Sequence, residues 1–224
     1  MKNCRTIIYL IAACLMTVAA ATQAPALAQT RDQARDVLQQ ASQAYAQAGG
    51  VNAAFRIQTR ESGGQAGEEI AGSILLKGNK FKLTVPDEMI TWFDGRNQWL
   101  YIIAAEEVNL SNPGEEELLM INPVNVFQLW QHGFRCRYAG EKTLKGKAVK
   151  EVVLEPEDAQ SDIQSLTIDF DKATSQPRHI VITNKDRSGS VIDITQYQPH
   201  QDYPDQLFVF PQKEYPTASV IDLR

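Results

Sequence analysis

The sequence predicts an α+β fold, in which a large antiparallel sheet curves into an unclosed β-barrel with a helical lid over its open mouth. Short segments that alternate apolar and polar residues recur through most of the chain, and turns rather than helices separate them. Only one long helix and a pair of short, very apolar helices between residues 113 and 132 are available to cover this sheet. Because so few helices cannot cover about ten strands laid out flat, a sharply curved sheet is the more economical arrangement.

The first 28 residues have the pattern of a secretory signal peptide. Two basic residues precede an apolar stretch over residues 7–21, and Ala26-Leu27-Ala28 provides a small-residue cleavage site. We therefore expect export to the periplasm and a single domain over residues 29–224. An alternative is that Ile11-Ala12-Ala13-Cys14 is a lipidation motif, which would make Cys14 a lipid-anchored N-terminus. A membrane-spanning segment fits less well, because the apolar stretch is short.

Charge and cysteine content narrow the range of functions. The net charge is −5, and removal of Lys2 and Arg5 with the signal peptide changes it to −7. An acidic surface argues against nucleic-acid binding and against adhesion to anionic membranes. Only Cys136 would remain in the mature chain, so no internal disulfide is expected. We expect this thiol to be buried and inert, the alternatives being a free thiol or a bridge between two chains.

The mature chain is expected to begin with a helix and to continue with strands. Thr30-Arg31-Asp32-Gln33 has the pattern of a capping box, apolar residues follow it at helical spacing, and Gly49-Gly50 ends the helix. The period then changes to two, which predicts a first strand over residues 51–60. Further strands are expected at residues 70–77, 81–85, 89–93, 98–103 and 108–110.

The stretch between residues 89 and 132 is the most distinctive part of the chain. Asp94-Gly95 joins two aromatic, β-branched segments, which is a strong hairpin signal. Asn112-Pro113 and Asn122-Pro123 each combine a capping residue with a proline, which predicts two short helices in succession. After these helices, strands are expected at residues 134–139, 149–154, 166–170, 179–183 and 191–197.

Little in the sequence points to catalysis. The three histidines, His132, His179 and His200, lack metal-ligand spacing, and no nucleophile elbow, phosphate-binding loop or dinucleotide-binding turn is present. The acidic run 115–117 suits a helix N-terminus, and Asp169-x-Asp171 suits a solvated strand end, although either could serve as an acid–base pair. We expect no enzymatic activity, no metal and no cofactor. The aromatic residues of the interior suit either a packed core or a cavity.

The run Phe93-Asp94-Gly95-Arg96-Asn97-Gln98-Trp99-Leu100-Tyr101, with the capped helix before it, the strand that contains Phe55 and the helical insert after it, resembles the LolA family of periplasmic lipoprotein carriers. The stretches 208–211 and 215–224 are similar to a divergent branch of that family. The resemblance implies a helical lid over a hydrophobic cavity that binds the acyl chains of lipoproteins. It also implies a monomeric carrier that takes cargo from an inner-membrane lipoprotein-releasing transporter to the outer membrane, where an acceptor is possible.

The residues expected to bind lipid are apolar side chains of the early strands, the hairpin and the two short helices. They are Phe55, Ile57, Phe81, Leu83, Trp92, Trp99, Tyr101, Leu118, Leu119, Phe127 and Trp130. One departure from the family pattern concerns the lid. Better-known members carry an arginine before a proline that tethers the empty lid, whereas the corresponding stretch here is Lys77-Gly78-Asn79. Whether Lys77 takes this role is left open by the sequence.

Two other functions remain open at this stage. One is a periplasmic regulatory or lipid-sensing protein of the same fold, which would act through contacts with a partner protein. The other is an exported hydrolase that uses an unrecognised carboxylate pair.

Overall fold

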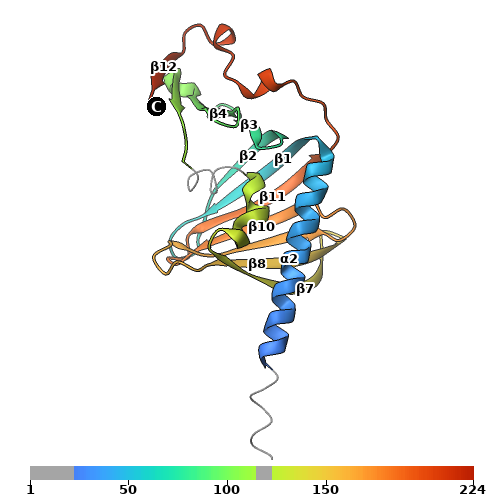
Figure 1. Cartoon of the computed structure of the whole chain (residues 1–224). Coiled ribbons are helices and arrows are strands. Elements are labelled where there is room, and N and C mark those ends of the chain that lie inside the picture. The colour runs from blue at the N-terminus through green and yellow to red at the C-terminus, as the bar shows by residue number, and fades with distance from the viewer. Residues whose placement is uncertain (1–22, 115–122) are drawn as a thin grey trace, which may run out of the picture.

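The computed structural model describes residues 23–114 and 123–224, and this part of the chain contains one α-helix, α2 (Gln23–Ala48), beside one twelve-stranded sheet (Figure 1). Short 3₁₀ helices, η1 (Ile103–Ala105), η2 (Pro123–Gln131), η3 (Asp205–Phe208) and η4 (Gln212–Glu214), lie in the connections. The strands are β1 (Gly50–Arg60), β2 (Ala66–Lys77), β3 (Lys80–Val85), β4 (Met89–Phe93), β5 (Gln98–Ile102), β6 (Glu107–Ser111), β7 (Phe134–Leu144), β8 (Lys147–Pro156), β9 (Ile163–Asp171), β10 (Pro177–Asn184), β11 (Gly189–Gln198) and β12 (Ser219–Asp222). Their order across the sheet is β12-β6-β5-β4-β3-β2-β1-β11-β10-β9-β8-β7.

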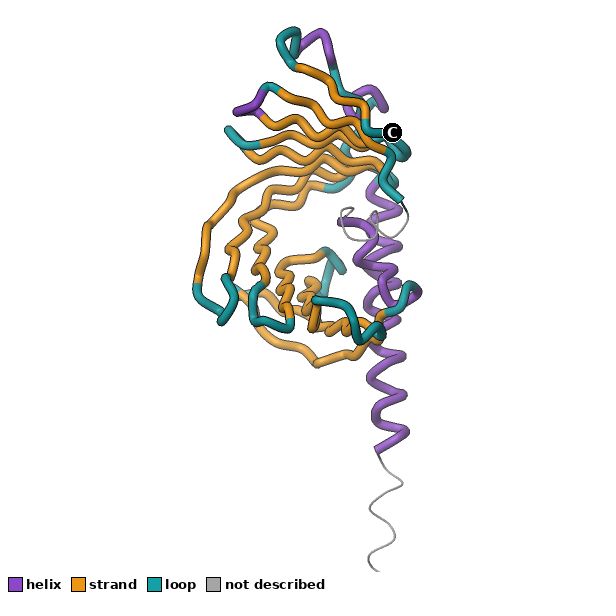
Figure 2. Tube along the Cα trace, turned by 90° about the vertical axis from the view of Figure 1, so that its left-hand side faces the viewer, coloured by secondary structure: helices purple, strands orange, loops and turns teal. Residues whose placement is uncertain are grey.

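The sheet is an unclosed barrel, as the sequence predicts. All neighbouring strands are antiparallel except β12 and β6, which run parallel. The two edge strands, β12 and β7, lie at opposite ends of the strand order. Figure 2 shows the sheet curving around an interior, with α2 standing along the open side. The helix packs against β7 and β8, at the end of the sheet opposite β12.

Helix α2 begins earlier than the sequence pattern predicts. It starts at Gln23 instead of Thr30, so the expected capping box lies inside the helix. The reason is that the preceding residues are rich in alanine, a strong helix former, and that Pro25 lies in the first turn, where proline is tolerated. The apolar face is the predicted one, and all of its residues are buried: Ala34, Val37, Leu38, Ala41, Tyr45 and Ala48. Gly49, with φ of +70°, follows the helix end.

Every predicted strand is present, several with longer bounds. The greatest extension is in the β7–β8 hairpin, which continues to a turn at Lys145 and Gly146, both with positive φ. The Asp94 turn between β4 and β5 is also as expected, since the Asp94 carboxylate accepts hydrogen bonds from the backbone N–H of Arg96 (2.8 Å) and Asn97 (2.7 Å). The short strand β12 was not predicted, because its pairing with β6 joins segments far apart in the sequence.

The helical insert between β6 and β7 is described in part. Its second half is a 3₁₀ helix, η2 (Pro123–Gln131), which confirms the helix predicted after Asn122-Pro123. The first predicted helix, including Leu118 and Leu119, lies outside the described residues.

Two apolar clusters pack on opposite faces of the sheet. The larger lies on the concave face, between the sheet, α2 and η2, and includes Phe93. The smaller contains Trp92, Tyr101, Val108 and Phe210. Because neighbouring residues of a strand point to opposite faces, the assignment of Phe93 and Trp92 to different clusters places the smaller cluster on the outer face.

Candidate functional site

A line of four isoleucines crosses the concave face, perpendicular to the strands. Ile57 of β1 pairs in register with Ile192 of β11, which pairs with Ile180 of β10, which in turn pairs with Ile168 of β9. We call these four residues the isoleucine row. Their common face follows from the period of two along each strand together with the antiparallel register.

Burial changes along the isoleucine row. Ile168 is fully buried, whereas Ile180, Ile192 and Ile57 are only half-buried although they pack against the concave cluster. Three aliphatic side chains therefore retain contact with solvent on an inward-curving face. Apolar surface of this kind is available to a ligand, because removing it from water is favourable and leaves no polar group without a hydrogen-bond partner.

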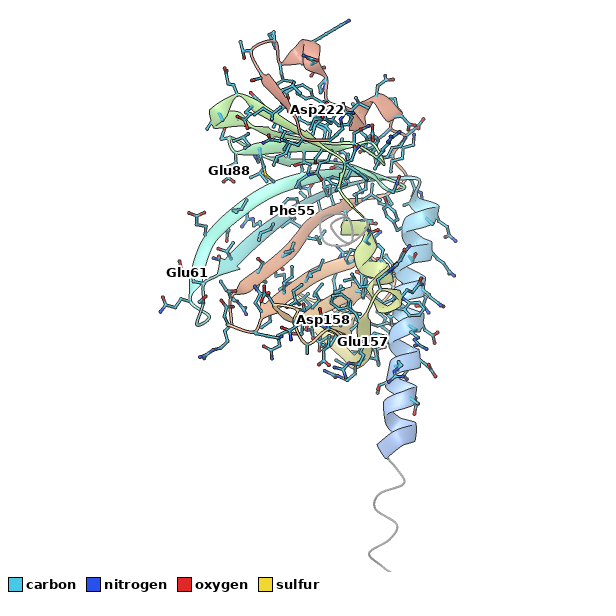
Figure 3. All side chains as sticks on the ribbon, turned by 60° about the vertical axis from the view of Figure 1, so that its left-hand side comes forward. Phe55, Glu61, Glu88, Glu157, Asp158 and Asp222 are labelled. Atoms are coloured by element: carbon cyan, nitrogen blue, oxygen red, sulfur yellow. The ribbon has the colours of Figure 1, made fainter. Side chains whose placement is uncertain are left out.

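Phe55 continues this apolar face along β1. It lies within the curve of the sheet (Figure 3) and is buried in the concave cluster. Its ring packs over Gly72 of β2, where a Cβ atom would lie 2.5 Å from Phe55 Cζ. Any larger residue at position 72 would displace the ring, so the small residue there sets the position of Phe55.

Helix η2 is held against α2 and the sheet by aromatic contacts. The Phe127 ring lies between Tyr45 of α2 and Phe170 of β9, with centroid separations of 6.3 and 6.1 Å. The Tyr45 hydroxyl donates a hydrogen bond to the Gly78 carbonyl at 2.7 Å. The Trp130 ring is half-buried, and the guanidinium carbon of Arg35 lies 5.3 Å from its centroid, within cation–π range.

The tyrosines near this interior carry no charge at neutral pH. Burial raises the pKa of Tyr197 to about 12, and burial also raises the pKa of Tyr45, with a smaller contribution from Tyr197. Both hydroxyls are therefore neutral, and the concave cluster stays apolar.

The structure divides the predicted lipid-binding residues into two groups. Those in or against the concave cluster are Phe55, Ile57, Phe81, Leu83, Phe127 and Trp130. Trp92, Trp99 and Tyr101 belong instead to the outer cluster, so the structure does not bring the two groups together.

The aromatic residues on the outer face are covered by the C-terminal segment. Phe210 and Tyr215 contact Trp92 with ring centroids 5.3 and 5.8 Å apart, and Tyr215 lies 4.9 Å from Tyr101. Trp92 is 1% exposed as a result.

Sequence reasoning also missed the isoleucines of the row beyond Ile57. The alternation of apolar and polar residues at 179–183 and 191–197 was the signal that could have identified them.

A comparison with protein families identifies this architecture. The family model described as outer membrane lipoprotein carrier protein LolA matches residues 24–190, which is most of the chain. The chain belongs to the LolA family.

One solved structure shares the fold at low sequence identity, and two others are similar to a lesser degree. An uncharacterised conserved protein from Thermus thermophilus aligns with a TM-score of 0.59 and 13% identity over 85% of this chain and 99% of that one. A LolA superfamily protein from Nitrosomonas europaea aligns with a TM-score of 0.45 and 13% identity over 79% of this chain and 97% of that one. LprF from Mycobacterium bovis aligns with a TM-score of 0.44 and 12% identity over 77% of this chain and 96% of that one. No curated protein matches the chain.

Lys77, whose role the sequence leaves open, contacts the C-terminal segment. The Lys77 ammonium donates to the Tyr203 carbonyl at 2.7 Å and pairs with Asp205 at 2.8 Å, and Lys80 pairs with the other Asp205 oxygen at 2.6 Å. Hydrogen bonds from Lys77 and Lys80 lower the pKa of Asp205 to about 2. Lys77 thus fixes the C-terminal segment, while η2 is held by the contacts of Tyr45 and Arg35.

The carboxylate pair of β9 was expected to be solvated, and this expectation is wrong. Asp169 is fully buried on the outer face and pairs with Lys142 Nζ at 2.9 Å, while Lys142 also bonds Glu151. Asp171 is 7% exposed, pairs with Arg178 at 3.0 Å and accepts the backbone N–H of residues 173 and 174. The β7–β8 hairpin supplies the lysine that sequence reasoning did not anticipate. These carboxylates hold turns and strands together.

Other titratable residues also have structural surroundings. Cys136 is buried as expected, with Sγ 3.9 Å from the Arg31 carbonyl oxygen. Burial raises the pKa of its thiol, although the guanidinium groups of Arg35 and Arg31 act in the opposite direction. His179 Nδ1 lies 2.9 Å from Asp193 Oδ1 on the outer face. Within residues 23–114 and 123–224 no group of three His, Cys, Asp or Glu side chains could hold a metal ion.

The described part of the chain contains no helix that is both long and apolar enough to span a membrane.

Proposed function

We propose that this protein is a periplasmic carrier that binds the acyl chains of lipoproteins on its concave face and carries them to the outer membrane. The observation that carries the proposal is the isoleucine row, in which Ile57, Ile192 and Ile180 are only half-buried on an inward-curving apolar surface. Membership of the LolA family supports the same role. We infer that cargo comes from an inner-membrane lipoprotein-releasing transporter, and that an outer-membrane acceptor is its possible destination.

The energetics of an acyl chain favour such a site. Each CH₂ group removed from water contributes about 0.8 kcal/mol, so a sixteen-carbon chain is on the order of 10 kcal/mol less stable when exposed. A carrier therefore has to cover most of the chain. It also has to release it, and a face with aliphatic side chains and neutral tyrosines offers contact area without a strong polar anchor.

The expected signal cleavage is compatible with the helix. Cleavage after Ala28 would remove the first turns of α2 and leave Thr30-Arg31-Asp32-Gln33 near the new N-terminus. The threonine and glutamine of this box then satisfy N–H groups that the shortened helix leaves free. The capping box is thus a feature of the proposed mature protein, Gln29 to Arg224.

Mass spectrometry of material that co-purifies with the protein tests the proposal. The full chain is expressed in a Gram-negative host, purified from the periplasm under mild conditions and examined for bound acylated peptides. We expect acylated lipoproteins in stoichiometric amounts, and much less of them with Ile192→Asp. Recovery of a protein free of acylated material, under conditions that preserve a known carrier's cargo, would contradict the proposed function.

A further inference from the structure

A small cavity lies where η2 leads into β7, at one end of the concave face. Its volume is about 110 Å³. Its walls come from three separate parts of the chain, and Figure 3 shows Glu157 at this end of the molecule, beside the lower half of α2. The lining includes Arg31, Arg35, Trp130, Phe134, Arg135 and Glu157. We call this space the arginine cavity.

The arginine cavity is positively charged in a protein whose net charge is −5. Three arginines and one acidic residue, the exposed Glu157, line it. The guanidinium groups of Arg31 and Arg35 lie close enough to Cys136, another lining residue, to oppose the rise that burial causes in the pKa of its thiol. Among the described residues, neither Arg31 nor Arg135 forms an ion pair, and Arg35 makes only a long, exposed one of 3.8 Å with Asp32. A surface pair of that kind leaves the guanidinium largely free to bind another anion.

Arg35 also has an unused donor. Its Nε is buried and has no hydrogen-bond partner in the described part of the chain, which is an unfavourable arrangement for an N–H group. The guanidinium is held in place by its contact with the Trp130 ring, at 5.3 Å, and by its interaction with the Cys136 thiol, which opposes the effect of burial on the pKa of that thiol. A planar guanidinium fixed in this way is well suited to bind a carboxylate or a phosphate oxygen.

The arginine cavity borders side chains of the apolar interior. Trp130 and Phe134 line it, and both are half-buried residues that pack against the concave cluster. These two side chains supply apolar contact for the part of an acyl ligand next to its headgroup. The cavity has room for three or four water molecules at roughly 30 Å³ each, which is enough for a carboxylate or a phosphate group.

We propose that the arginine cavity binds the anionic headgroup, a carboxylate or a phosphodiester, of an acyl ligand whose chain lies on the concave face. This inference rests on the proposed binding of acyl chains and adds a preference for acidic amphiphiles over neutral ones. The guanidinium groups of Arg31 and Arg35 supply charge-assisted hydrogen bonds, and Trp130 contacts the first carbons of the chain.

Displacement of a fluorescent acyl probe tests the proposal with three ligands of equal chain length. Palmitate carries a carboxylate, palmitoyl lysophosphatidylglycerol carries a phosphodiester, and monopalmitoylglycerol is neutral; all are used below their micelle concentrations. For the native protein we expect at least one acidic ligand to bind about tenfold more tightly than the neutral one, the effect of one charge-assisted contact. Which of the two acidic ligands is preferred distinguishes a fatty acid from a phospholipid.

The variant that removes the cationic side chains is the double substitution Arg31→Gln and Arg35→Gln. We expect it to abolish the preference while leaving affinity for monopalmitoylglycerol within about twofold, because the apolar surface is unchanged. The double substitution Arg60→Gln and Arg96→Gln removes the same charge at two exposed positions, one at the end of β1 and one in the β4–β5 turn; it is the matched control and should keep the preference.

The outcomes separate this inference from the function on which it rests. Equal binding of acidic and neutral ligands by the native protein would overturn the proposed headgroup binding in the arginine cavity and leave the proposed acyl binding intact. An equal loss of preference in the control variant, Arg60→Gln with Arg96→Gln, would show a long-range charge effect and would also overturn the proposed headgroup binding. Failure of all three ligands to bind would overturn the proposed acyl binding and this inference together. Because the native protein alone provides the first comparison, the test does not depend on the stability of the variants.

Discussion

Substitution of neighbouring isoleucines by aspartate distinguishes an acyl-binding face from an ordinary packed core. Ile180 and Ile168 occupy paired positions on β10 and β9 and point to the same face, but Ile180 is half-buried and Ile168 is 0% exposed. At position 180 a new carboxylate can hydrate through the open side, so we expect Ile180→Asp to lower the free energy of unfolding by about 1–2 kcal/mol. At position 168 the carboxylate has no access to water, and we expect a loss of about 4 kcal/mol or more.

Urea denaturation, followed by the fluorescence of the three tryptophans, measures both losses. Since a domain of this kind is stable by roughly 5–15 kcal/mol, Ile180→Asp should remain folded at room temperature. It should nevertheless bind a fluorescent acyl probe far more weakly than the native protein. Val181→Asp, the next residue and therefore on the outer face, is the control and should bind normally. Equal destabilisation by Ile180→Asp and Ile168→Asp, without acyl binding by the native protein, would mean that the interior is simply core.

Three further predictions concern the chain ends and the polar contacts. The mature protein should begin at Gln29, and metabolic labelling with a palmitate analogue should leave it unlabelled; label that disappears in Cys14→Ser would overturn this. Cys136→Ser should retain cargo binding and folding, since the thiol has no cysteine partner among the described residues and burial raises its pKa; loss of cargo from a folded variant would show a functional thiol. The pKa of Asp205 is lowered to about 2 in the folded protein. The contribution of its pairs with Lys77 and Lys80 to the free energy of unfolding should therefore be fully present above pH 4 and be lost as pH falls towards 2. Asp205→Asn should remove that part of the pH dependence of unfolding, and an unchanged pH profile would contradict it.

The strands and the buried face of the helix could be predicted from the sequence because local periodicity determines both. The bounds of α2 could not, because residues 23–29 favour a helix by composition even though Thr30 has the pattern of a cap. Strand β12 depends on its pairing with β6, which no local pattern contains.

The candidate site was predictable only in part, and the β4 strand shows why. Thr91, Trp92 and Phe93 are all buried, since α2 and η2 cover one face of the sheet and the C-terminal segment covers the other. When both faces are covered, alternation no longer reveals which side is concave. The aromatic side chains of this hairpin were therefore grouped together although they point to opposite faces. The arginine cavity depends in the same way on tertiary contacts between α2, η2, β7 and the turn after β8.

Site-specific photocrosslinking tests the central claim, that the concave face carries the acyl chains of lipoproteins. A photoreactive phenylalanine analogue is placed at Ile192, on the isoleucine row, or at Val191, the adjacent residue on the outer face. Cells are labelled with an alkynyl fatty acid, irradiated, and the crosslinked adducts are analysed by mass spectrometry. We predict acyl-labelled lipoprotein adducts from position 192 and very few from position 191. Equal crosslinking from both positions, or none from position 192 in a folded protein, would contradict the account.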